Sequence, residues 1–88
     1  MKLRRLTCHD LVVDGDQSAA YVGDSVVVLS PISTTVLTAL AEDRWESVTD
    51  VAALVEETYG NPPEGSAFEA VSGVVYELAR LGLVERVD

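Results

Sequence analysis

Apolar and polar residues follow one period in the first third of the chain and another in the rest of it. Residues 7–14, 18–22 and 25–30 are rich in residue types that favour strands, and short polar stretches separate them. The second of these stretches, Gly23-Asp24, has the two-residue length of a hairpin turn. The pattern therefore predicts a three-stranded antiparallel sheet whose strands follow one another along the chain.

The third predicted strand is apolar on both faces. It reads Ser25-Val26-Val27-Val28-Leu29-Ser30, whereas a strand with one face in water alternates apolar and polar residues. One explanation is that the strand is central in the sheet and that both of its faces are buried. The other is that it is an edge strand, whose unpaired backbone groups and apolar surroundings would bind an extended peptide by β-augmentation. The period alone does not decide between the two.

Three helices are predicted after the strands, and each begins with a serine as N-cap. Ser30 precedes Pro31, which is favourable as a first helical residue, while Ser47 and Ser66 each precede an acidic residue three positions on. The predicted helices cover residues 31–42, 48–59 and 67–81. This order predicts a single α+β domain over residues 1–88, a three-stranded antiparallel sheet followed by three helices in a winged helix-turn-helix-like arrangement.

Length and charge narrow the range of functions. The chain has 88 residues, enough for one domain with one small core. It has 6 Lys and Arg against 15 Asp and Glu, a formal net charge of −9, and Lys2, Arg4 and Arg5 are half of its basic residues. A field of this sign repels nucleic acid and anionic membranes and attracts basic peptides. We therefore expect a basic partner, no nucleic acid and no membrane association.

The residues that could carry chemistry are few. Cys8 is the only cysteine, which is typical of a cytoplasmic protein without disulfides. Cys8 and His9 are neighbours on a predicted strand, so their side chains point to opposite faces and cannot form a nucleophile and base pair. With Asp10 they would supply at most a partial metal site. We expect no catalytic residue, no metal and no cofactor, and hence a protein that is not an enzyme.

The helix-turn-helix pattern leaves a second hypothesis open, a divergent winged-helix DNA-binding protein. The polar face of the predicted helix 67–81 carries Glu69 and Glu77 against a single base, Arg80, where a DNA reader needs clustered Lys and Arg. A further alternative is a small non-enzymatic adaptor that docks on a protein partner through the strand 25–30 edge.

The chain resembles the PqqD-like proteins, which are recognition elements for precursor peptides of ribosomally synthesised and post-translationally modified peptides. The resemblance covers about residues 8–85. It rests on the order of the elements, on the Leu29-Ser30-Pro31 junction, on the helix that ends at Tyr59-Gly60 and on the ending Leu78 to Glu85. Family members commonly have an aromatic pair on the third strand, where this chain has small aliphatic residues. It is most similar to the stand-alone leader-binding proteins of lasso peptide biosynthesis.

The resemblance implies a function. The protein would bind the leader segment of a precursor peptide as an added strand at the sheet edge. It would then present the precursor to a leader peptidase, a transglutaminase-like cysteine protease, with the ring-closing enzyme as a further partner. The peptide-binding residues that the resemblance implies are Val26, Val27, Val28 and Leu29 on the strand and Val71, Val75 and Leu78 on the third helix. On this view a Val75→Glu substitution weakens leader binding and leaves the fold intact.

Overall fold

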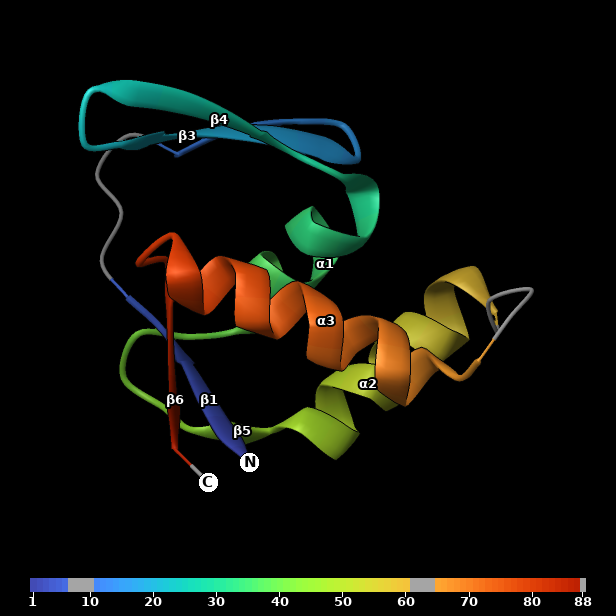
Figure 1. Ribbon diagram of the computed structural model, residues 1–88. Helices are drawn as coiled ribbons and strands as arrows, with labels where there is room; N and C mark the ends of the chain where they lie inside the picture. Colours follow the sequence, from blue (N-terminus) through green and yellow to red (C-terminus); the bar gives the residue numbers. More distant parts are fainter. Residues whose placement is uncertain (7–10, 61–64, 88) are drawn as a thin grey trace.

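A computed structural model describes residues 1–6, 11–60 and 65–87 (Figure 1). Within these ranges the chain forms an α+β fold with three helices and two antiparallel sheets of three strands each. The first sheet, here called the meander sheet, has the strand order β2 (Leu11–Asp14), β3 (Gln17–Val22), β4 (Ser25–Leu29). The second, the terminal sheet, has the order β5 (Glu46–Ser47), β1 (Lys2–Arg5), β6 (Val84–Val87). The helices are α1 (Pro31–Ala39), α2 (Val48–Tyr59) and α3 (Ala67–Arg80).

The meander sheet confirms the predicted three-stranded antiparallel sheet. Its two connections are two-residue turns that begin with Gly15 at φ 65° and Gly23 at φ 62°, each followed by an aspartate at negative φ. This is the pattern of type II′ turns, whose twist matches that of the strands they join. The part of the predicted strand 7–14 before Leu11 lies outside the described residues. The third strand ends at Leu29, one residue early, because Ser30 caps α1.

The helices begin where the sequence predicts. Ser30, Ser47 and Ser66 each accept a hydrogen bond from the backbone N–H three residues on, at 3.1–3.2 Å. The observed α2 matches the predicted range, and α3 ends one residue early. By contrast, α1 ends at Ala39 rather than at residue 42, because Leu40 adopts an extended backbone with ψ 148° and is buried.

The terminal sheet was not predicted from the sequence. Its middle strand, β1, is mostly charged and lacks the apolar residues from which a strand is predicted. In the structure Leu3 is completely buried, while Arg4 bonds Glu85 of β6 at 2.9 Å and lies 4.9 Å from the centre of the Trp45 ring. Leu3 therefore anchors the strand on its inner face, and Arg4 forms contacts on the opposite face.

The helices and the inner faces of the two sheets enclose the core. In Figure 1 the meander sheet lies above the helices and the terminal sheet below α3. The largest fully buried side chains are Leu3, Leu37, Leu78, Val36, Val71 and Val75. None of the helices in the described ranges is both long enough and apolar enough to cross a bilayer.

Candidate functional site

The strand that the sequence singled out, β4, lies at the edge of the meander sheet. Among the described residues it pairs only with β3, so one side of its backbone has no strand partner. Its side chains alternate: Leu29 is buried and Val27 is half-buried on the inner face, while Val26 is 54% exposed and Val28 72% exposed on the outer face. Of the two explanations for an all-apolar strand, the edge position is therefore the one observed.

The pairing register indicates which backbone groups of β4 point to the free side. A two-residue hairpin turn is closed by a hydrogen-bonded pair, after which hydrogen-bonded and non-hydrogen-bonded pairs alternate. The closing pair is Val22 with Ser25, so Val26 and Val28 occupy non-hydrogen-bonded positions. The N–H and C=O groups of Val26 and Val28 therefore point away from β3 and are available to another extended chain.

The edge of β4 differs in charge from the other sheet edges in the described part of the chain. The other edge strands carry Asp14 in β2, Glu46 in β5, and Glu85 with Arg86 in β6. Charged residues are one of the devices that protect a sheet edge from pairing with a further strand. Because β4 carries none, it is the described edge best suited to accept one.

The three helix residues that the resemblance implied lie in the core. Val71 and Val75 are 0% exposed and Leu78 is 1% exposed in the structure without a ligand. Their contact with a peptide therefore stays a prediction. The side chains of α3 that solvent reaches at the margin of the core are Val74 and, just after the helix, Leu81, which are partly buried. Helical spacing places them on one flank of the apolar stripe, which could have been read from the sequence.

The buried position of Val75 also changes the expectation for Val75→Glu. A carboxylate at this position would be surrounded by core valines and leucines without a partner, which costs several kcal/mol. We therefore expect the substitution to unfold the domain rather than to weaken peptide binding alone.

Aspartates lie at both turns of the meander sheet. Residues 11–43 contain no Lys or Arg, and Asp14, Asp16 and Asp24 lie at or beside its two turns. A positive ligand approaching β4 would meet no nearby base on this part of the chain. The local charge therefore has the same sign as the net charge of −9.

No candidate metal site is found in the described ranges. They contain no group of three or more His, Cys, Asp or Glu that could hold a metal ion, and Cys8-His9-Asp10 lies outside them.

On the exposed side of α3, Arg80 donates hydrogen bonds to the Glu77 carboxylate, which lowers the pKa of Glu77 and raises that of Arg80. This contact is an ion pair on the helix surface.

Comparisons with protein-family models, with curated proteins and with solved structures find no match. The fold thus defines the class: an α+β domain in which a short antiparallel sheet presents one uncharged, unpaired strand edge.

Proposed function

We propose that the protein binds the leader segment of a ribosomally made precursor peptide as a fourth strand of the meander sheet, along the free edge of β4. The observation that carries the proposal is this edge, which is uncharged, five residues long and without a strand partner in the described part of the chain. The resemblance to PqqD-like proteins supports the same strand and the same mode of binding.

The backbone of β4 would supply most of the affinity. Val26 and Val28 offer two N–H donors and two C=O acceptors toward the free side, which suffices to hold a short extended peptide in register. Main-chain hydrogen bonds are insensitive to sequence, so pockets for alternate side chains must supply the specificity. Val27, which is half-buried on β4 itself and packs against the core, is the residue of the strand suited to that role.

The ligand would fold as it binds. A disordered leader that becomes a strand loses conformational freedom, at a cost of roughly 2–5 kcal/mol of the gross interaction energy. The negative charge of the domain would speed the capture of a basic leader, and added salt would reduce that effect. Binding is thus expected to combine fast association with moderate affinity.

The proposed role is presentation rather than catalysis. The domain would hold the leader while a leader peptidase, a transglutaminase-like cysteine protease, and the ring-closing enzyme act on the precursor, as in lasso peptide biosynthesis. A single cysteine in the sequence is typical of a reducing compartment, so the proposal places the protein in the cytoplasm.

The test is an amide NMR titration of the protein with a synthetic basic leader peptide. We expect the Val26 and Val28 amides to gain protection from hydrogen exchange, since their N–H groups point to the free side. Val28→Pro removes one of these donors without removing a bond to β3, and should weaken binding at least tenfold.

The matched control is Val13→Pro. By the same register argument, Val13 directs its N–H to the free side of β2, at the opposite edge of the same sheet. This variant should bind the leader as the unmodified protein does. Equal loss of binding in both variants, or no loss in Val28→Pro, would show that the leader does not add to β4.

A further inference from the structure

The outer face of the meander sheet is apolar although no element in the described ranges covers it. Val12 is 67% exposed, Tyr21 59% and Val28 72%, and all three point away from the helices together with Ala19 and Val26. An antiparallel sheet with one face in water normally presents polar residues there. Contiguous exposed apolar residues of this kind mark interaction surfaces.

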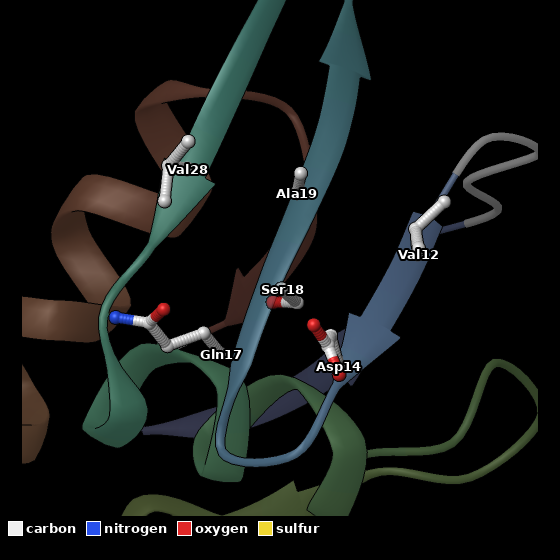
Figure 2. A pocket seen from close by; sticks show the side chains of 6 residues that line it. All are labelled: Val12, Asp14, Gln17, Ser18, Ala19 and Val28. Carbon is white, nitrogen blue, oxygen red and sulfur yellow. The ribbon is translucent and has the colours of Figure 1, made fainter.

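A hollow lies in the middle of this face. Val12, Ala19 and Val28 are register partners on the three neighbouring strands, and the small Ala19 lies between the two valines (Figure 2). The hollow has a volume of about 180 Å³. A cavity of roughly 150 Å³ admits benzene, so this hollow has room for one Leu or Phe side chain of a partner.

The rim of the hollow is acidic at one end. Asp14 and Gln17, a register pair beside the first turn, complete its lining, and Figure 2 shows both next to Ser18. Because residues 11–43 contain no Lys or Arg, the Asp14 carboxylate has no basic neighbour in sequence on this sheet. A partner that places an apolar side chain in the hollow would therefore gain by placing Lys or Arg beside it. A second copy of the chain would instead bring further aspartates.

The dimensions of the face suit a single helix. Three strands at about 4.8 Å spacing span roughly 10 Å, and a helix with its side chains is about 10–12 Å wide. On a helix, residues four positions apart lie about 6 Å from one another on the same face. One helix can thus carry both the apolar anchor and the base one turn away.

We propose that the outer face of the meander sheet docks an amphipathic basic helix of a partner protein. One Leu or Phe of that helix occupies the hollow over Ala19, and a Lys or Arg one turn away pairs with Asp14. The peptide edge uses the backbone of β4, whereas this surface uses side chains across all three strands. Both can be occupied at the same time, so the inference goes beyond the proposed leader binding.

The test uses a synthetic 18-residue helix of Leu and Lys with all Leu on one face, and a scrambled peptide of the same composition without that face. We expect the amphipathic helix to bind at least tenfold more tightly than the scrambled peptide. Its amide NMR shifts should centre on Val12, Ala19, Tyr21 and Val28. Equal affinity of the two peptides, or shifts centred elsewhere, would overturn the proposal.

Two variants probe the hollow and its rim. Ala19→Leu fills the hollow with a side chain of the sheet itself and should reduce the affinity for the amphipathic helix at least tenfold. Ala53→Leu makes the same change at an exposed position of α2 and should have no effect. Asp14→Lys, at an exposed rim position, should reduce the affinity several-fold and flatten its salt dependence, which keeps the test decisive if Ala19→Leu fails to fold.

The two proposals can fail separately. Leader binding at β4 should persist in Ala19→Leu, because the substitution leaves the outward backbone groups of Val26 and Val28 unchanged. Loss of helix binding with leader binding retained supports the outer-face proposal. Unchanged helix binding in a folded Ala19→Leu protein refutes it, whatever happens at the edge.

Discussion

The hydrogen bond between Ser18 and Thr34 gives the sharpest prediction about how the meander sheet is held on the helices. The two hydroxyl oxygens, Ser18 Oγ and Thr34 Oγ1, lie 2.8 Å apart, and each residue is only 4% exposed. They are the two buried polar residues of the described chain, and they connect β3 to α1. The bond thus links the sheet that carries the candidate site to the helical layer.

Ser18→Ala removes the Ser18 hydroxyl and leaves the Thr34 hydroxyl in the core without its hydrogen-bond partner. A buried polar group that loses its partner destabilises a protein by about 1–3 kcal/mol. The lower part of this range is expected, because Thr34 lies within α1 and its hydroxyl can turn to the Ser30 carbonyl four residues earlier. For a domain of this size, each 1 kcal/mol lowers the melting temperature by about 4–8 °C.

The double variant Ser18→Ala/Thr34→Val separates the bond from the packing. Replacing both partners by apolar groups of similar shape removes the unpaired hydroxyl, so the double variant should be destabilised by less than the sum of the two single changes. Urea unfolding followed by circular dichroism gives the free energy of unfolding of all four proteins. The reasoning would be refuted if the double variant lost as much free energy of unfolding as the two single variants together. It would also be refuted if each single variant lay within about 0.3 kcal/mol of the unmodified protein.

Two further predictions concern α3. Val75→Glu should abolish cooperative unfolding and the dispersion of the amide NMR spectrum, whereas Leu54→Glu, at a 40% exposed position of α2, should leave both unchanged. Arg80→Gln should raise the pKa of Glu77 toward its ordinary value, which carboxyl NMR titration measures. Because the pKa of Glu77 is lowered in the folded protein, the ion pair stabilises the fold above the unfolded pKa and loses this effect as the pH falls through the folded pKa. The stability difference between Arg80→Gln and the unmodified protein should therefore shrink in acid, and a constant difference would contradict the assignment.

Local signals account for what the sequence predicted well. The three N-cap serines, the glycine at the start of the second hairpin turn and Gly60 after α2 each act within a few residues, so the elements they delimit could be placed from the chain alone. The three-stranded meander followed for the same reason, since its strands are joined by short turns.

The terminal sheet could not be predicted because its information is not local. β1 has one buried apolar residue, Leu3, among charged ones, and β5 has only two residues. Both become strands only through pairing with distant segments: β1 pairs with β6, as in Lys2 with Val87, and β5 pairs with β1, as in Ser47 with Lys2. No window of the sequence contains both partners.

The candidate site was predictable in part. An apolar run on both faces of a strand indicates either a central strand with both faces buried or an edge strand that binds a partner. Which of the two holds depends on the strands that pair beside it, and these are not local in the sequence. For α3, the helical period identifies the apolar face but not how deeply each residue of that face is buried. Only packing against α1 and α2 places Val71 and Val75 in the core and leaves Val74 at its margin.

The pairing of β1 with β6 has a consequence for the synthesis of the protein. Lys2 and Leu3 leave the ribosome more than eighty residues ahead of their partners Val87 and Arg86. The meander sheet and α1 need only nearby residues and can form while translation continues, whereas the terminal sheet can close only once residue 87 has emerged. The nascent chain would therefore carry a formed β4 edge before the core beneath it is complete, and at that stage a chaperone or an early ligand can reach the strand first.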